Sequence, residues 1–388
     1  MDPRGIKTIC MIPVVECILL IAAGICVADE PVLTTRLCKE FALPNGYPCQ
    51  EFNVTTSDGY ILMIQRIQHG REGPQNGSSR PPVVLGAGVF QQAALWLLNP
   101  PEQSLGFILA DVGFDVWFLN FRGTAESSKH VSLTIEDKEF WIWSFDELAS
   151  FDVPAVLQFV YQTTGSQAYY VGHSQGTTIG LAALADPNVR QMVKAAVLLS
   201  PIAYLSHTTS QLALAFSEMY LDKEINCSVA LDSFTGKKLA RSCTLKDILK
   251  QVHAQCPNSE INSSRIGFYS TFMPQPTSAN NVAHLSQLIR KEGFGKYDMG
   301  KEGNMKKYGQ DTPPEYDISS IPKKFPILIT YGGSDHLSDL VDVQNLIYNL
   351  RCSVKTFYIP NYGHADYVLG TSAATKAYPQ IIGFLRSI

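Results

Sequence analysis

The residue best suited to nucleophilic chemistry is Ser174, which lies in Gly172-His-Ser174-Gln-Gly176 and matches the pattern Gly-x-Ser-x-Gly. Strand-like Tyr169-Tyr-Val171 precedes it, and a helix-like run begins at Thr177. The flanking glycines leave room for a sharp strand-to-helix turn, which would lift the serine hydroxyl clear of a sheet. A surface turn rich in small residues is the alternative, and the flanking strand and helix favour the nucleophile.

A serine hydroxyl needs a base beside it and an acid that fixes the tautomer of that base. Around a turn of this kind the chain order is Ser, then Asp, then His. Asp335 ends a strand-like run in Tyr331-Gly-Gly-Ser-Asp335, and His364 follows the next such run. Both should lie at the sheet edge where Ser174 emerges, which predicts a Ser174–His364–Asp335 triad.

Other histidines and aspartates could compete for these roles. The rival histidines lie in the turn itself, directly after Asp335, or in the long segment after residue 203: His173, His336, His253 and His284. Asp339 and Asp342 are expected at the solvated start of a helix. Asp366 is too close in sequence to His364 to orient it.

The oxyanion of an acyl-transfer reaction needs two backbone N–H donors. The first comes from the residue after the nucleophile, Gln175. The second comes from the loop after an early strand. Val83-Val-Leu-Gly-Ala-Gly-Val89 ends a strand in a glycine-bearing turn, so Val89 is the candidate, with an ordinary turn as the alternative.

These residues require a sheet that brings several loops to one edge. Strand-like runs occupy 83–85, 114–120, 168–171, 195–199, 325–331 and 354–359, and helix-like runs occupy 105–112, 175–184, 340–350 and 371–385. A capping box, Ser144-Phe-Asp-Glu147, opens a further helix. A hairpin over 51–66, with a two-residue turn at Asp58-Gly59, comes first. This alternation predicts an α/β fold with a mostly parallel central sheet flanked by helices.

The alternation breaks between about Tyr204 and Ile321. Strand-like patterns are scarce there, and the run Pro274–Asn281 is polar and contains proline. The pattern predicts a cap or lid, residues 204–321, inserted between two parts of one core, 29–203 and 322–388.

Composition limits the partners and cofactors. The chain has 388 residues, of which 45% are hydrophobic, so it can bury one large core. Its net charge of −4 and the absence of long runs of one sign argue against nucleic acid. No CxxC pair or zinc-spaced cluster occurs, so we expect no metal. The sequence leaves the oligomeric state open.

The N-terminal residues predict entry into the secretory pathway. A basic head and an apolar run suggest a cleaved signal peptide, 1–28. A retained anchor is the alternative, but the run is shorter than the roughly 20 residues that a bilayer needs. Glycosylation sequons begin at Asn53, Asn76, Asn226 and Asn262. In an oxidising compartment Cys38 and Cys49 would close a short disulfide loop, with buried free thiols as the alternative. The destination would be the cell exterior or a vacuole- or lysosome-like lumen.

The sequence resembles the acid lipase family, which includes gastric and lysosomal lipases, and particularly its plant members. The resemblance runs from about residue 35 to 387. It rests on Gly46-Tyr-Pro-Cys49, Thr56-Ser-Asp-Gly-Tyr60, Asn99–Ala110, Gly113-Phe-Asp-Val-Trp117, Gly172–Thr177, Gln275-Pro-Thr-Ser278 and Gly332-Gly-Ser-Asp335. It implies an α/β-hydrolase fold, hydrolysis of neutral-lipid or other acyl esters, and no cofactor. It also implies a cap over a hydrophobic acyl site, through which the protein could contact a lipid surface transiently.

The sequence departs from the family around the oxyanion loop. Family members usually have His-Gly where this chain has Ala87-Gly88, and Gly-Asp before a Trp where it has Ala93-Ala-Leu-Trp96. After Arg122-Gly-Thr124, where the family tends to be basic or aromatic, Ala125-Glu-Ser-Ser follows. These changes leave the triad intact but bear on the substrate.

Three functions therefore compete. The first is an ester hydrolase of lipase type. The second is an esterase or acyltransferase of specialised metabolism that acts on a non-triglyceride ester. The third is a non-catalytic lipid- or ligand-binding relative, against which the complete triad argues.

Overall fold

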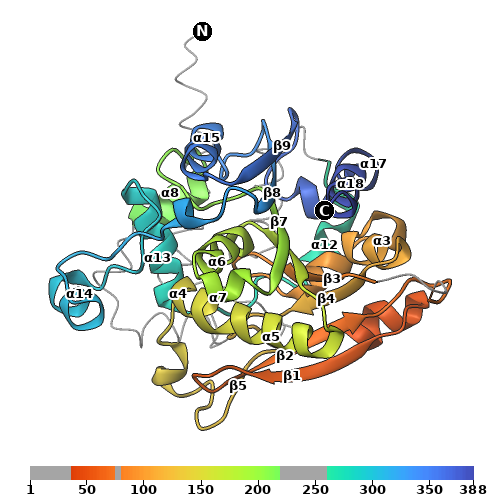
Figure 1. Ribbon diagram of the computed structural model, residues 1–388, viewed down its shortest axis with the longest axis horizontal. Helices are drawn as coiled ribbons and strands as arrows, with labels where there is room; N and C mark the ends of the chain where they lie inside the picture. The colour runs from red at the N-terminus through yellow and green to blue at the C-terminus, as the bar shows by residue number, and fades with distance from the viewer. Residues whose placement is uncertain (1–35, 75–79, 219–259) are drawn as a thin grey trace.

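The computed structural model describes residues 36–74, 80–218 and 260–388 (Figure 1). The predicted signal peptide, the sequons at Asn76 and Asn226, and His253 lie outside these residues. In the described part, no helix has both the length and the apolar character needed to span a bilayer.

The core is a single sheet with nine strands among the described residues. They are β1 (Gln50–Thr55), β2 (Tyr60–Ile67), β3 (Pro82–Gly86), β4 (Asp115–Leu119), β5 (Lys129–His130), β6 (Ala168–His173), β7 (Val193–Leu199), β8 (Pro326–Gly332) and β9 (Ser353–Ile359). Their order is β1-β2-β4-β3-β6-β7-β8-β9, with β5 paired to β2. Neighbouring strands in the part of the sheet that runs from β4 through β3, β6, β7 and β8 to β9 are parallel. The pairs that involve β1, β2 or β5 are antiparallel. The prediction of a mostly parallel sheet is confirmed.

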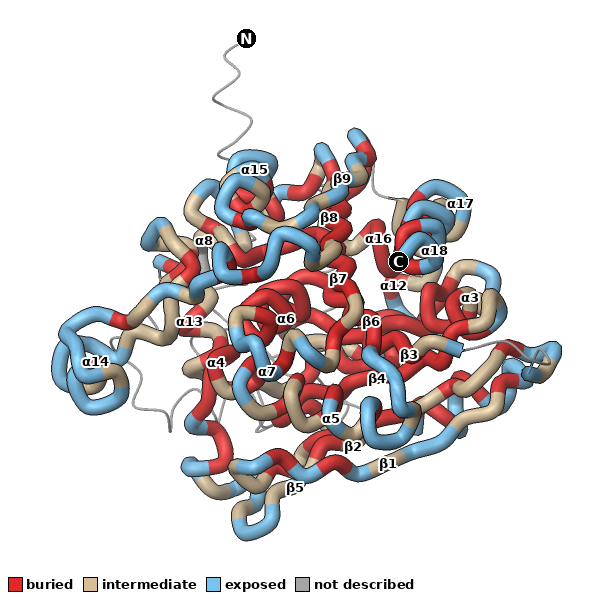
Figure 2. Tube along the Cα trace, in the orientation of Figure 1, coloured by how far each residue is buried: buried red, intermediate tan, exposed pale blue. Residues whose placement is uncertain are grey.

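Both faces of the central strands are buried, because successive side chains point into two different apolar layers. Val84 packs in one layer, and Val83 and Leu85 pack in the other. The first layer contains α4 (Phe145–Glu147), α5 (Val153–Thr164), α6 (Gln175–Leu184), α7 (Pro187–Arg190) and α15 (Leu340–Asn349). The second contains α3 (Leu105–Asp111), α16 (Asp366–Leu369), α17 (Ala373–Lys376) and α18 (Tyr378–Arg386). Figure 2 shows the resulting buried centre between more exposed outer helices.

Short helical turns complete the core. They are η1 (Cys38–Ala42), η2 (Leu43–Asn45), η3 (Ala93–Leu97), η4 (Pro101–Gln103), η5 (Lys138–Trp141) and η6 (Leu148–Asp152). The predicted disulfide is present, and it joins Cys38 of η1 to Cys49 just before β1, with a Cα–Cα distance of 5.3 Å. The predicted capping box at Ser144 and Glu147 is also present, at the start of α4.

Two local predictions are wrong. The hairpin turn has four residues, 56–59, because the N–H of Thr56 donates to the carbonyl of Tyr60 at 2.8 Å and closes a wider loop. The predicted helix 371–385 is two helices, α17 and α18, separated at Ala377. Pro379 occupies the first turn of α18, where a residue without an N–H is tolerated and favours a new helix start.

The segment between β7 and β8 supplies no strand to the sheet from its described residues. Its described elements are α8 (Gln211–Glu218), η7 (Ser263–Arg265), α12 (Ile266–Tyr269), α13 (Ala279–Arg290), α14 (Gly300–Tyr308) and η8 (Ile318–Ser320). We refer to it below as the insertion. Helix α14 stands at the periphery, at the left of Figure 1. Asp146 of α4 anchors this part by accepting hydrogen bonds from the Tyr308 and Tyr316 hydroxyls.

Candidate active site

Ser174 occupies a sharp turn between β6 and α6, with φ of 53° and ψ of −124°. This backbone is strained for a residue with a side chain, and it is fixed in part by the Ser174 N–H donating to the Leu199 carbonyl at 3.0 Å. The turn needs its glycines, because a Cβ on Gly176 would lie 2.3 Å from the Gly86 carbonyl oxygen. The motif therefore forms the predicted strand-to-helix turn.

Asp335 and His364 meet at the carboxyl ends of β8 and β9. His364 Nδ1 lies 3.1 Å and 3.0 Å from the two carboxylate oxygens of Asp335. The N–H groups of Leu337 and Ser338 also donate to this carboxylate, at 2.9 Å and 2.8 Å. Burial alone would raise the pKa of Asp335, but the His364 ring and these donors hold the pKa below its ordinary value. An ionised Asp335 accepts from Nδ1–H, which leaves His364 Nε2 with the free lone pair.

His364 Nε2 is buried and has no hydrogen-bond partner among the described residues, so it is not bonded to Ser174 Oγ. The ring nevertheless lies beside the turn. The carbonyl of His364 is 2.9 Å from Nε2 of His173, the residue before Ser174, and the two ring centroids are 5.2 Å apart.

His173 joins the turn to the loop of His364. A carbonyl oxygen can only accept, so His173 must donate from Nε2 to His364. Burial, followed by the nearby His364, lowers the pKa of His173 to about 3, so the ring stays neutral. His173 thus supports the site structurally and is not the base.

The loop after β3 lies directly against Ser174. A Cβ on Gly88 would be 2.9 Å from Ser174 Cβ and 3.2 Å from its Oγ, so only glycine permits this approach. The N–H of Gly88 donates to Gln91 Oε1 at 2.8 Å. Within the described residues, the next N–H, that of Val89, donates to no other group. Gln175 begins α6, where the first N–H groups lack partners within the helix. Sequence reasoning missed Gln91, which no motif marks.

The positions that depart from the family pattern are packed. Ala87, Ala93 and Ala94 are each at most 1% exposed, and the last two belong to the buried turn η3. The Ala125 N–H donates to Gln275 Oε1 of the insertion at 3.0 Å. The alanines of the loop after β3 are therefore packed inside the fold.

The rival residues have other partners. His336 is exposed, and its Nδ1 lies 2.9 Å from Thr209 Oγ1. Asp366 accepts from the Gly363 N–H at 2.6 Å and from the Glu260 N–H at 3.0 Å. Asp339 caps α15, as predicted. His284 is buried, and its ring stacks on Phe145.

Asp342 lies in the first turn of α15, as predicted, but the expectation that it is solvated is wrong. Its side chain is buried beneath His207 of the insertion. Asp342 Oδ1 accepts from His207 Nδ1 at 2.9 Å, and Oδ2 accepts from the His207 N–H at 2.9 Å. Ser206 Oγ is 3.1 Å from the same Nδ1. A catalytic triad needs the serine and the acid on different ring nitrogens, so this second Ser–His–Asp cluster is structural.

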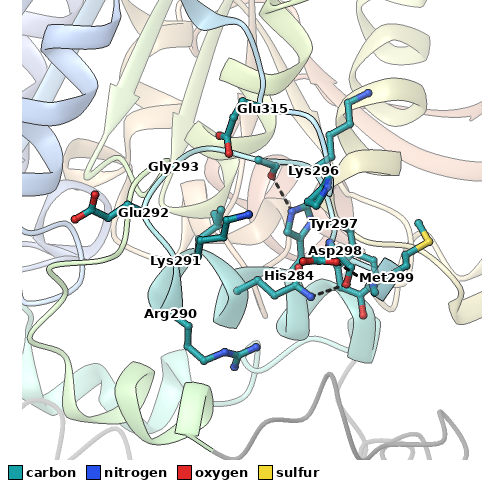
Figure 3. Close-up of a pocket in the computed structure, with 15 residues that line it drawn as sticks. His284, Arg290, Lys291, Glu292, Gly293, Lys296, Tyr297, Asp298, Met299 and Glu315 are labelled. Carbon is teal, nitrogen blue, oxygen red and sulfur yellow. Dashed lines mark hydrogen bonds between the residues drawn. The ribbon is translucent and has the colours of Figure 1, made fainter. Parts of the chain in front are cut away.

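An open pocket lies elsewhere, in the insertion. Its volume is about 540 Å³, and it lies at the C-terminal end of α13 (Figure 3). Its lining includes charged side chains of both signs: Lys291, Glu292, Lys296, Asp298 and Glu315. None of the triad candidates lines this pocket, and its polarity does not suit an acyl chain.

The remaining predicted site residues are accessible to different degrees. Asn53 is exposed on β1. Asn262 is half-buried, and its side chain caps η7 by accepting from the Ser264 N–H at 3.1 Å. In the described part, no group of three or more His, Cys, Asp or Glu residues is placed to hold a metal ion.

Two family models match the chain. The alpha/beta hydrolase fold matches residues 103–371, and the partial alpha/beta-hydrolase lipase region matches residues 38–100.

Curated relatives match most of the chain. Triacylglycerol lipase 1 of Arabidopsis thaliana is 42% identical, with 90% of each chain covered. Lysosomal acid lipase/cholesteryl ester hydrolase of Homo sapiens is 36% identical, with 88% of each covered. Gastric triacylglycerol lipase of Rattus norvegicus is 36% identical, with 88% of this chain and 89% of the relative covered.

Among solved structures, a monoglyceride lipase of Saccharomyces cerevisiae is similar, with a TM-score of 0.55 and 14% identity. That match covers 92% of this chain and 97% of the other. At this identity the likeness shows the fold alone.

Proposed function

Because this chain belongs to the lipases of the α/β-hydrolase family, which are carboxylic ester hydrolases, we propose that it is a serine ester hydrolase whose catalytic residues are Ser174, His364 and Asp335. The contact between Asp335 and His364 Nδ1 carries this proposal. It fixes the tautomer that leaves Nε2 free to accept the proton of Ser174. The strained backbone at Ser174 supports the same assignment.

The reaction would proceed in two halves. Ser174 Oγ attacks the ester carbonyl carbon while its proton passes to His364 Nε2, and the Gln175 and Val89 N–H groups hold the oxyanion. Collapse of this intermediate breaks the ester C–O bond, and His364 gives its proton to the leaving alcohol. Water then attacks the acyl-enzyme by the same route, which releases the carboxylic acid and restores Ser174.

We propose a neutral lipid or another acyl ester as the substrate. The relatives' names include triacylglycerol lipases and a cholesteryl ester hydrolase. The insertion, residues 204–321, would cover the acyl site and contact a lipid surface transiently. A secretory route, to the cell exterior or to a vacuole- or lysosome-like lumen, fits the Cys38–Cys49 disulfide and the exposed sequon at Asn53.

A fluorophosphonate probe, which modifies activated serines, tests the nucleophile directly. We expect labelling of the wild type and none of Ser174→Ala, together with loss of p-nitrophenyl ester hydrolysis. Ser206→Ala is the matched control, because Ser206 belongs to the structural Ser–His–Asp cluster and should label normally. Equal labelling of wild type and Ser174→Ala, or loss only in Ser206→Ala, would refute the assignment.

A second candidate keeps the chemistry and changes the ester. Gln92, in the loop after β3, is 2% exposed, and neither of its amide atoms has a hydrogen-bond partner among the described residues. An unpaired buried amide is costly unless a ligand or water satisfies it. We propose, as the second candidate, an esterase or acyltransferase whose ester is more polar than a triglyceride and supplies partners to this amide. A panel of esters with and without an acceptor alcohol would separate the two candidates.

A further inference from the structure

Strained backbone occurs beside both proposed oxyanion donors. Ser174, before Gln175, has φ of 53°, and Phe90, after Val89, has φ of 59°. Residues other than glycine hold such conformations only where their surroundings fix them. Two contacts that fix these neighbourhoods come from the insertion.

The first contact is a reciprocal pair of side-chain amides. Gln175 Nε2 donates to Asn281 Oδ1 at 2.8 Å, and Asn281 Nδ2 donates to Gln175 Oε1 at 3.1 Å. Both residues are buried, at 2% and 1% exposure. Buried amides paired at both ends resist displacement, since breaking the pair leaves both amide atoms of Gln175 and the Oδ1 of Asn281 without these partners. The pair thus ties the residue after the nucleophile to α13.

The position of Asn281 is itself fixed to the core. Ser278 caps α13 by accepting from the Asn280 N–H, and its hydroxyl donates to the Trp141 carbonyl at 2.6 Å. Asn281 Nδ2 also donates to Thr277 Oγ1 at 3.0 Å. The Asn281 amide that bonds Gln175 is therefore held in position by the capped start of α13 and by Thr277.

The second contact holds the other donor loop. The Gln275 N–H donates to the Phe90 carbonyl at 2.8 Å. Gln275 is 1% exposed, and its side chain accepts from the Ala125 N–H and donates to the Phe272 carbonyl at 3.0 Å each. Every polar group of the Gln275 side chain is thus engaged, and the backbone next to Val89 is held in place.

We infer that Gln275 and Asn281, which we call the brace, set the spacing between the two N–H groups of the oxyanion hole. They are positioning residues, because Asn281 acts through Gln175 and Gln275 acts through Phe90. Oxyanion donors stabilise a transition state only when they are fixed at hydrogen-bond distance from the place where the charge develops. This inference rests on the proposed function and gives the insertion a part in catalysis besides covering the site.

Asn281→Ala should lower kcat about tenfold, less than the loss of a whole donor, and should leave KM within about twofold. In the Gln175→Ala background the same change should have no further effect on kcat, because its route of action is already gone. Gln287→Ala is the matched control. Gln287 also lies on α13, and both ends of its amide are bonded. Its Nε2 donates to the Asp298 carbonyl at 2.8 Å, and its Oε1 accepts from the Asp298 N–H at 2.9 Å. These bonds do not involve Gln175 or Phe90. Gln287→Ala should keep the wild-type kcat even if its unfolding temperature falls.

Inhibition by an alkyl trifluoromethyl ketone supplies the second readout, since it forms a serine-bound oxyanion. In Asn281→Ala the Ki of this inhibitor should rise by the same factor by which kcat/KM falls. Each rate is divided by the concentration of active sites found by titration. If Asn281→Ala does not fold, Asn281→Ser, which keeps one hydrogen-bonding oxygen, takes its place. An unchanged kcat, full additivity with Gln175→Ala, or an equal loss in Gln287→Ala would overturn the brace. Full activity of Ser174→Ala would instead overturn the proposed function.

Discussion

At the scale of single residues, hydrogen bonds hold one nitrogen of the His364 ring and leave the other nitrogen unbonded among the described residues. Asp335 is satisfied by His364 and by two backbone N–H groups, whereas His364 Nε2 has no partner among the described residues. Such an arrangement fixes the ring by one nitrogen and leaves the other for chemistry. The roles follow from the hydrogen bonds of each side chain, and not from the residue types alone.

Asp335→Asn should lower kcat by about ten-thousandfold, because the amide no longer fixes the Nδ1–H tautomer of His364. Initial rates on a short p-nitrophenyl ester would measure this. Asp342→Asn is the control, since it changes another buried aspartate that is paired with a histidine. It should lower the unfolding temperature and spare kcat. Equal losses of kcat in the two variants would show that Asp335 acts only on stability.

At the scale of elements, the centre of the sheet could be predicted because its strands β3, β4, β6 and β7 are buried on both faces and stand out as apolar runs. Helix α6 matches its predicted bounds, since the glycine-flanked turn marks its start. The hairpin turn was mispredicted, because the hydrogen bond of Thr56 to Tyr60 outweighs the two-residue signal of Asp58-Gly59.

Long-range side-chain contacts lay beyond the sequence. Gln175 and Asn281 are separated by 106 positions, and no periodicity links them. The burial of Asp342 was missed for the same reason, since its partner His207 belongs to the insertion. A sequence pattern shows which residues start a helix but not which distant group will cover their side chains.

The contact of His207 with Asp342 predicts a pH-dependent link between the insertion and α15. The hydrogen bond to Asp342 raises the pKa of His207 above its ordinary value. The stabilisation is therefore fully present below about pH 6.5 and is lost as the pH rises through the raised pKa. His207→Gln should lower the unfolding temperature more at pH 5.5 than at pH 8.5. A difference that is the same at both pH values, or larger at pH 8.5, would contradict this.

At the scale of the whole molecule, the site draws on residues from most of the chain. Val89, Ser174 and His364 come from separate loops, and the brace comes from the insertion between β7 and β8. The sheet brings them to one edge, because parallel strands end on the same side.

Removing the Cys38–Cys49 disulfide should weaken the fold and leave the chemistry of the site unchanged. Cys38→Ser with Cys49→Ser should lower the free energy of unfolding by roughly 3 kcal/mol, the value expected for opening a loop of this length. Urea denaturation at 25 °C would measure the change. The kcat at that temperature should stay within about twofold of wild type, since no described hydrogen bond links these residues to the site. A drop in kcat without a drop in stability would contradict the prediction.

The place of β9 has a consequence for the life of the protein in a cell. This strand is at the edge of the sheet and pairs with β8, and His364 comes just after it. During synthesis the chain emerges from its N-terminus, so Ser174 is made long before His364, its proposed base. On that proposal we expect no ester hydrolysis until β9 has docked on β8.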